Sequence, residues 1–167
     1  MWTGLHPVDG PWPGKLALAS RPRGGDWIED EMASWRREGV DLVLSLLTPE
    51  EEQDLDLEDE RRAAQARGIQ FISLPIPDRQ VPGSEAEVAS VLERVDAALS
   101  SGKNVVVHCR QGIGRTGLLA ACLLVAKGWD PDGAVASVSS ARGLPVPETA
   151  EQRQWIDHYA AILSGAE

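Results

Sequence analysis

Short apolar runs alternate along this chain with segments of helical periodicity, and the alternation leaves few folds open. The apolar runs predict strands at residues 15–19, 40–47, 69–74 and 104–108. Helical spacing and boundary residues predict helices at 26–38, 58–67, 84–101 and 115–127, and two more from about 130 and 149. Strands joined by helices need right-handed crossovers, so the sheet is largely parallel and covered on both faces. The sequence therefore predicts a single α/β domain with a mostly parallel central sheet of four to five strands flanked by helices.

Two segments lie outside this alternation. Residues 1–14 hold three prolines and three glycines, so we expect an irregular N-terminal arm there and the folded domain over residues 15–167. The same segment lacks the basic head and apolar stretch of a signal peptide, and none is expected. Residues 49–60 hold eight acidic residues in twelve positions, which is typical of a solvated helix face or a loop.

Charge and cysteine content exclude several classes of protein. A net charge of −10 and a pI near 4.7 argue against binding to nucleic acid or to an anionic membrane surface. The longest apolar run, near residues 118–125, is far shorter than the ~20 residues that span a bilayer. Two cysteines are too few for a disulfide scaffold, so a cytoplasmic protein is expected. The three histidines lie far apart, so no metal cofactor is expected, and no oligomeric state is predicted.

One glycine-rich stretch between a predicted strand and a predicted helix carries the chemistry. It reads Val-His-Cys-Arg-Gln-Gly-Ile-Gly-Arg-Thr-Gly over residues 107–117. Gly112 and Gly114 give the backbone the freedom to curl its N–H groups round one point above the helix N-terminus, which makes an anion site. Arg115 adds a planar fork of donors that suits phosphate oxygens. The predicted phosphate-binding residues are Arg110, Gln111, Gly112, Ile113, Gly114 and Arg115.

Cys109 is the first residue of this loop. The surrounding donors favour its thiolate form, so the sequence predicts a nucleophile held against a bound phosphate. An inert core cysteine followed by an ordinary glycine turn is the alternative. The cysteine, the arginine after a five-residue gap, the glycines and the strand–loop–helix context coincide here, which favours the functional interpretation.

The stretch resembles the signature of the cysteine-dependent protein tyrosine phosphatase superfamily, His-Cys-x5-Arg-Ser/Thr, at His108-Cys109 through Arg115-Thr116. The resemblance implies the fold of the compact dual-specificity phosphatases. It also implies that Cys109 attacks phosphorus and forms a phosphocysteine, while Arg115 binds the phosphoryl oxygens and stabilises the transition state. Thr116 would give its hydroxyl to the thiolate, and His108 would order the loop from behind.

Cleavage of a phosphoester also needs a proton for the departing oxygen. In open parallel sheets ligands bind at the carboxyl ends of the strands, and the loop after the third predicted strand reads Pro-Ile-Pro-Asp-Arg-Gln-Val-Pro-Gly over residues 75–83. Asp78 in this loop lies 31 residues before Cys109, a spacing similar to that of the general acid in small dual-specificity phosphatases. An ordinary turn aspartate is the alternative interpretation.

Gln152 and Cys122 are the remaining candidates near the site. Residues 148–152 are similar to the Gln-Thr-x-x-Gln segment that positions the hydrolytic water in some family members, although Glu148 replaces the first Gln. Gln152 therefore positions water, or it completes a capping box with Thr149 for the last helix; the sequence leaves both open. Cys122 lies ~10 Å further along the helix after the loop and is predicted to pack in the core.

The function predicted is hydrolysis of phosphomonoesters, phosphotyrosine in proteins first and phosphoserine or phosphothreonine second. The alternatives are an inositol phosphate or other small phosphomonoester as substrate, a phosphate-binding pseudophosphatase, and a sulfurtransferase. Ile113 stands where several lipid phosphatases of the superfamily have a lysine, which weakens the inositol-lipid alternative. Arginines at 21, 23, 79 and 110 follow predicted strands at the same sheet edge, so a basic pocket mouth that attracts acidic substrates is expected. Solvated arginines that pair with the many acidic residues are the alternative.

Overall fold

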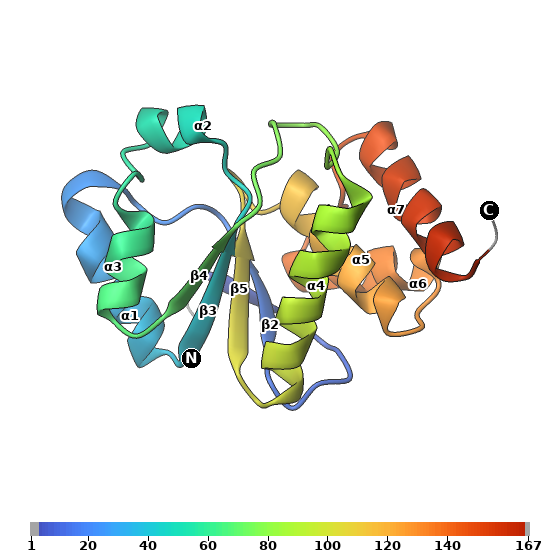
Figure 1. Ribbon diagram of the computed structural model, residues 1–167, viewed down its shortest axis with the longest axis horizontal. Coiled ribbons are helices and arrows are strands. Elements are labelled where there is room, and N and C mark those ends of the chain that lie inside the picture. The colour runs from blue at the N-terminus through green and yellow to red at the C-terminus, as the bar shows by residue number, and fades with distance from the viewer. Residues whose placement is uncertain (1–3, 166–167) are drawn as a thin grey trace.

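A five-stranded sheet forms the centre of the computed structural model, which describes residues 4–165 (Figure 1). The strand order is β1-β2-β5-β3-β4. The strands are β1 (Leu5–Val8), β2 (Leu16–Ala19), β3 (Val40–Ser45), β4 (Gln70–Ser73) and β5 (Asn104–His108). β2, β5, β3 and β4 are parallel to one another, and β1 pairs antiparallel with β2. The predicted single α/β domain with a mostly parallel sheet is confirmed.

The prediction of an irregular arm over residues 1–14 is wrong for part of its length. Leu5–Val8 forms the edge strand β1, while residues 1–3 lie outside the described part of the chain. Pro7 pairs opposite Ala17 in this strand. An edge strand tolerates proline because only one of its sides needs donors for the ladder, so the proline that suggested an arm is compatible with pairing.

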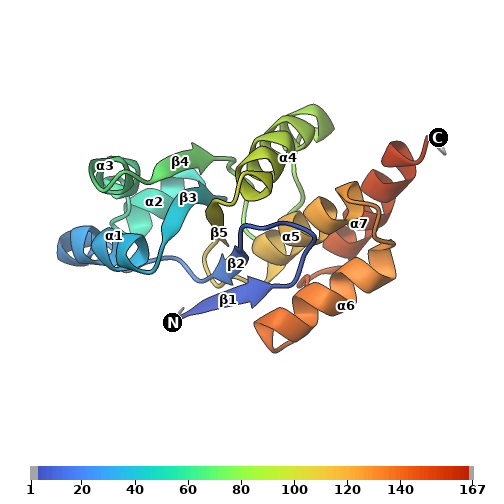
Figure 2. The same ribbon diagram turned by 90° about the horizontal axis from the view of Figure 1, so that it is seen from below.

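Helices cover both faces of the sheet, as Figure 2 shows from below. On one face lie the 3-10 turn η1 (Gly25–Trp27), α1 (Ile28–Arg37) and α3 (Glu60–Ala66). On the other face lie α4 (Glu85–Ser100), α5 (Gly114–Ala126), α6 (Pro131–Arg142) and α7 (Ala150–Leu163). Side chains alternate along β5, so Val105 and Val107 join the larger apolar cluster around α5 while Val106 joins the cluster under α1. No helix within residues 4–165 is long and apolar enough to cross a membrane.

The acidic run over residues 49–60 contains a short helix, which corresponds to the helix-face interpretation rather than to a loop. α2 (Pro49–Asp54) begins after Thr48, whose side chain accepts a hydrogen bond from the amide of Glu51 in a complete capping box. The interpretation of this run as solvated is wrong at two positions, because Glu51 and Glu60 are buried. Both carboxylates turn toward the loop that follows β5.

The parallel strands bring their carboxyl ends to one edge. His108 at the end of β5 is in register with Ala19 at the end of β2 and with Ser45 at the end of β3. Ser45 is in turn opposite Ser73, where β4 ends. The loops after these strands therefore meet around the central strand β5, and the predicted nucleophile loop lies in the middle of them.

Candidate active site

The loop between β5 and α5 turns its carbonyl groups outward. Neighbouring elements donate to these carbonyls: Arg21 N to Arg110 O (3.3 Å), Ser20 Oγ and Arg142 Nη2 to Gln111 O (3.3 and 3.0 Å), and Arg142 Nε to Gly112 O (3.1 Å). In a trans peptide unit the N–H points opposite to the carbonyl, so a carbonyl that faces outward places the next N–H on the inner side of the loop. In the described part of the chain, none of the N–H groups of residues 110–114 donates to another protein group. The inner side of the loop is therefore a cradle of unpaired donors at the N-terminus of α5, suited to an anion.

Two glycines allow this close arrangement. Gly112 has a φ of +73°, and a Cβ on it would lie 2.5 Å from the carbonyl oxygen of Ala19 in β2. A Cβ on Gly114 would lie 2.5 Å from Oε1 of Glu148. The loop therefore packs on β2 on one side and on the segment before α7 on the other, as only glycine permits.

A cavity of about 150 Å³ opens above the cradle. Its lining comprises Asp78, Arg79, Cys109, Arg110, Gln111, Arg115 and Glu148. Cys109 is 3% exposed and is a free cysteine. The structure thus brings together the predicted nucleophile, general acid and phosphate-binding arginine in one small cavity. The predicted contact of Thr116 is not present: its hydroxyl is buried, and within residues 4–165 it has no hydrogen-bond partner.

Arg115 is 2% exposed and held from several sides. Its Nη1 donates to Oε1 of Glu51 at 2.6 Å and to the carbonyl of Ile76 at 2.7 Å. Its Nη2 donates to Oε2 of Glu51 at 2.9 Å and to Oδ1 of Asp78 at 3.1 Å. Burial acts to lower the pKa of Arg115, but the hydrogen bonds to Glu51 and the nearby Cys109 and Asp78 raise it above its ordinary value. The guanidinium is therefore a permanent charge fixed at the base of the cavity.

Glu51 is a site residue that the sequence analysis missed. Its carboxylate accepts hydrogen bonds from both terminal nitrogens of Arg115. Its Oε2 also lies 3.5 Å from Nε of Arg110. Burial acts to raise the pKa of Glu51, but hydrogen bonds from Arg115 and from the amide of Thr48 outweigh it and hold the pKa below its ordinary value. The capping pattern of Thr48 and Glu51 is visible in the sequence. However, it lies within a run of acidic residues, and such a run predicts side chains that are exposed to solvent.

Asp78 lies in the loop after β4, next to Arg115. Its side chain is half exposed, lines the cavity and contacts Arg115. The two residues that follow are both held by the segment around the start of α7. Arg79, with a φ of +63°, pairs with Glu148 at 3.3 Å, and the carbonyl of Gln80 accepts from Nε2 of Gln152 at 3.1 Å. The acid loop is thereby attached to α7 directly behind the carboxyl group.

Gln152 is fully buried, and its contacts match the capping alternative. Its side-chain Oε1 accepts hydrogen bonds from the backbone amides of Glu148 and Thr149. Its backbone amide donates to the hydroxyl of Thr149. The amide nitrogen of its side chain is directed to Gln80, as described above. Gln152 thus caps α7 and braces the acid loop, and water positioning stays a prediction.

His108 is also fully buried, on the opposite side of β5 from the cavity. Its Nε2 lies 2.6 Å from Oε2 of Glu60 in α3, and its Nδ1 lies 3.3 Å from the carbonyl oxygen of Cys109. The imidazole therefore contacts the loop from behind, where the resemblance placed it. Glu60 and Arg142, which braces the outer carbonyls, were not predicted as site residues because neither lies near the signature in sequence.

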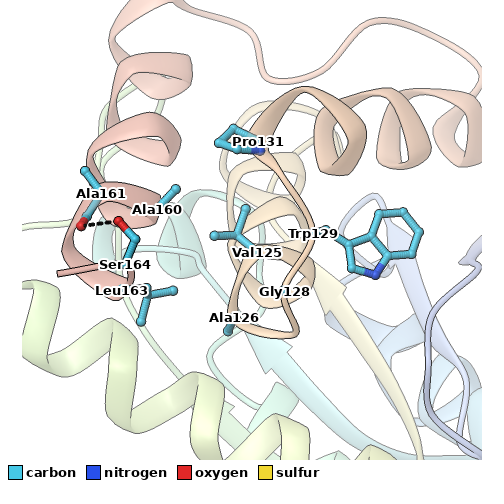
Figure 3. A pocket seen from close by; sticks show the side chains of 9 residues that line it. All are labelled: Val125, Ala126, Gly128, Trp129, Pro131, Ala160, Ala161, Leu163 and Ser164. Carbon is cyan, nitrogen blue, oxygen red and sulfur yellow. Dashed lines mark hydrogen bonds between the residues drawn. The ribbon is translucent and has the colours of Figure 1, made fainter. Parts of the chain in front are cut away.

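A larger cavity lies elsewhere in the described part of the chain. It measures about 650 Å³ and lies between the turn after α5 and the C-terminal part of α7 (Figure 3). Its labelled lining is mainly apolar, with Val125, Ala160 and Leu163 among the side chains, and Ser164 donates to the carbonyl of Ala161. It holds no acid, base or nucleophile apart from that hydroxyl, so the smaller cavity at Cys109 is the candidate site.

Comparisons with known proteins agree with this geometry. The sequence model of a family described as a DSP-PTPase phosphatase of polymorphic toxin systems matches residues 17–129. Cyclin-dependent kinase inhibitor 3 of Sus scrofa is 32% identical over 99 residues, 56% of this chain and 46% of that protein. The dual specificity protein phosphatase TpbA of Pseudomonas aeruginosa is 38% identical over 79 residues, 47% of this chain and 35% of that protein. The chain thus matches about half or less of the length of these curated relatives.

Solved structures show the same fold. Kinase-associated phosphatase, with a serine in place of its catalytic cysteine, has a TM-score of 0.84 at 21% identity, over 98% of both chains. TpbA in complex with pTyr has a TM-score of 0.61 at 24% identity, over 91% of this chain and 86% of that chain. The family model covers more than half of the chain and includes β2 to α5, with the nucleophile loop. The chain therefore belongs to the DSP-PTPase phosphatase family, the compact dual-specificity branch of the cysteine-dependent tyrosine phosphatases.

Proposed function

We propose that this chain hydrolyses phosphomonoesters, phosphotyrosine in proteins first, through a phosphocysteine intermediate. The observation that carries the proposal is the position of Cys109 in the lining of a small cavity, at the start of a loop whose N–H groups are unpaired, together with the fixed guanidinium of Arg115. Donors that are already aimed at a bound anion need no reorganisation when charge develops on the phosphoryl oxygens.

In the first step the sulfur of Cys109 forms a bond to phosphorus as the bond from phosphorus to the ester oxygen breaks. Asp78, which also lines the cavity, gives its proton to that departing oxygen. In the second step a water oxygen attacks phosphorus, the sulfur–phosphorus bond breaks, and the water proton passes to Asp78. Cys109 leaves as a thiolate, and inorganic phosphate remains in the cradle.

The names of the relatives support a phosphorylated protein as substrate. TpbA is named a dual specificity protein phosphatase, and one of its structures holds pTyr. We therefore propose phosphotyrosine as the preferred group and phosphoserine or phosphothreonine as secondary ones. A cytoplasmic location stays a prediction that rests on the two free cysteines.

The nucleophile is tested by Cys109→Ser. A serine hydroxyl does not ionise in the cradle, so turnover of nitrophenyl phosphate should be lost, while binding of vanadate, measured by calorimetry, should persist. Cys122→Ala is the matched control, since Cys122 is fully buried in α5 and should not affect turnover. Turnover retained by the serine variant would contradict the mechanism.

The substrate class needs a separate measurement. Rates on phosphotyrosine, phosphoserine and phosphothreonine peptides, inositol phosphates and thiosulfate should rank phosphotyrosine first. A higher kcat/KM on an inositol phosphate than on phosphotyrosine would leave the proposed mechanism intact but show that the proposed substrate class is wrong. Turnover of thiosulfate without phosphatase activity would identify a sulfurtransferase instead.

A further inference from the structure

A carboxylate and an imidazole are buried together behind the nucleophile loop. Glu60 in α3 and His108 at the end of β5 are both completely shielded from solvent. Their closest atoms, Oε2 and Nε2, are 2.6 Å apart. The other ring nitrogen of His108 lies 3.3 Å from the carbonyl oxygen of Cys109. A continuous contact therefore runs from α3, through the sheet, to the residue that carries the nucleophilic sulfur.

The alternation of side chains along a strand explains this arrangement. Val106 in β5 packs toward α1 and α3, so His108, two residues on, faces the same side. Cys109 belongs to the cluster on the opposite side. The imidazole thus occupies the face of the sheet away from the cavity, where it cannot touch a substrate and can act only through the backbone.

Burial of this pair costs free energy of folding, because both groups lose their contact with water. A buried carboxylate needs compensating donors, and within residues 4–165 the second oxygen of Glu60 has none. An apolar side chain at position 60 would not carry that desolvation cost. A costly group directly behind a reactive centre is the pattern expected of a functional one.

The two contacts of the imidazole suit a ring that carries a hydrogen on both nitrogens. Nδ1 then donates to the carbonyl of Cys109, and the short contact to Glu60 holds the second proton. If that proton lies on Nε2, the pair is an imidazolium beside a carboxylate. The positive ring is then the nearer of the two to Cys109, and it favours the thiolate over the thiol.

We propose that Glu60 is a positioning residue for the nucleophile: it holds a proton on His108, so that a charged imidazole supports the backbone of Cys109 and favours its thiolate. The inference rests on the proposed function, in which that thiolate is the attacking group. It assigns a role to α3, which contributes no residue to the cavity lining.

Other charges act on the pair from neighbouring elements. Glu52 of α2 faces both Glu60 and His108, and Arg61 of α3 lies beside Glu52. Burial and the charge of Glu60 raise the pKa of Glu52, so this carboxyl titrates above its usual range. Any pH profile of the pair therefore includes Glu52, and Glu52→Gln is needed to separate its contribution.

The test is the rate at which iodoacetamide alkylates the protein between about pH 5 and pH 9, since only the thiolate reacts. Cys122 does not interfere, because it is fully buried and burial raises its pKa. In Glu60→Gln the amide still donates to the imidazole but no longer stabilises its second proton. Alkylation near pH 6 should then slow by about 3- to 10-fold, and the whole profile should move to higher pH.

Two variants serve as controls. Glu50→Gln makes the same chemical change at an exposed position in α2 and should leave the profile unchanged. Glu60→Asp keeps the charge and should retain most of the reactivity at low pH, which a purely structural role would not predict. In a His108→Asn background, Glu60→Gln should have no further effect, because the residue through which it acts is gone.

An unchanged alkylation profile in folded Glu60→Gln would overturn the proposal, as would an equal loss in Glu60→Asp. The acid limb of kcat/KM for nitrophenyl phosphate should move in the same direction as alkylation. If alkylation shifts while no variant, nor the wild type, hydrolyses any phosphoester, then the role of Glu60 stands and the proposed function fails.

Discussion

Arg115 owes its position to acceptors on two separate loops, the start of α2 and the acid loop. Glu51 is the strongest of these acceptors, because it binds both terminal nitrogens of the guanidinium. We expect Glu51→Gln to lower kcat/KM for nitrophenyl phosphate by about tenfold or more, since the guanidinium loses its planar anchor. Glu50→Gln, an exposed neighbour in the same helix, is the control and should leave the rate unchanged. Equal rates in the two variants would contradict a role for Glu51.

The same residue should make stability depend on pH. The pKa of Glu51 is depressed in the folded chain, so its contribution is fully present above its ordinary value of 4.5 and is lost as the pH falls through the depressed value. At neutral pH we expect Glu51→Gln to reduce the free energy of unfolding by about 1–3 kcal/mol. Denaturant unfolding at several pH values should show this difference shrinking below about pH 4.5. A difference independent of pH would mean that the carboxylate charge does not stabilise the fold.

Asp78 is the second residue whose role is open to a direct test. We expect Asp78→Asn to lower kcat by about 10²–10⁴ for alkyl phosphates, whose leaving oxygens need a proton, and much less for an activated aryl phosphate. The measurement is a comparison of kcat across leaving groups of different basicity. Equal losses on good and poor leaving groups would show that Asp78 is not the general acid.

At the scale of elements, α6 holds the outside of the nucleophile loop through Arg142. Two of its nitrogens donate to successive carbonyls, and this keeps the opposite N–H groups directed into the cavity. We expect Arg142→Met to raise the inhibition constant of inorganic phosphate by about tenfold, with little change in melting temperature. Arg153→Met is the matched control, since Arg153 pairs with Asp132 and Asp157 away from the loop. An unchanged constant would show that the loop keeps its shape without α6.

Most elements could be predicted from the sequence because each leaves a local pattern. β5 begins and ends where its apolar run does, and α4 starts at the Ser84 cap. The signature loop is equally local, which is why Cys109 and Arg115 were found. Glu51, Glu60 and Arg142 could not be found in this way. Acidic residues in one run look alike until packing decides which of them turn inward, and contacts between distant elements leave no local pattern.

At the scale of the whole molecule, the expected basic pocket mouth is largely neutralised. Arg79 pairs with Glu148, Arg110 lies beside Glu51, and Arg23 pairs with Glu31. A paired arginine attracts an anionic substrate less than a free one does. The sequence predicted the position of these arginines at the carboxyl edge but not their partners, which come from other elements.

This pairing leads to a prediction about substrate choice. Removal of the partner charge in Glu148→Gln frees Arg79, so kcat/KM for a phosphotyrosine peptide with acidic flanks should rise severalfold relative to a neutral peptide. The gain should vanish at about 0.5 M salt, because exposed charges are then screened. Measurement of the ratio between the two peptides cancels any change in the chemical step. A ratio equal to that of the wild type at low salt would contradict the idea that Glu148 masks Arg79.

The position of Cys122 determines what happens when peroxide reaches the site. Oxidation of the Cys109 thiolate gives a sulfenic acid, which a nearby thiol can trap as a disulfide before further, irreversible oxidation. Cys122 is the other cysteine of the chain, but it is fully buried two turns into α5, ~10 Å along the helix from the loop, beyond the reach of a disulfide. The chain therefore holds no resolving thiol for its own nucleophile. A sulfenic acid at Cys109 is therefore expected to need a thiol from outside this chain for its reduction.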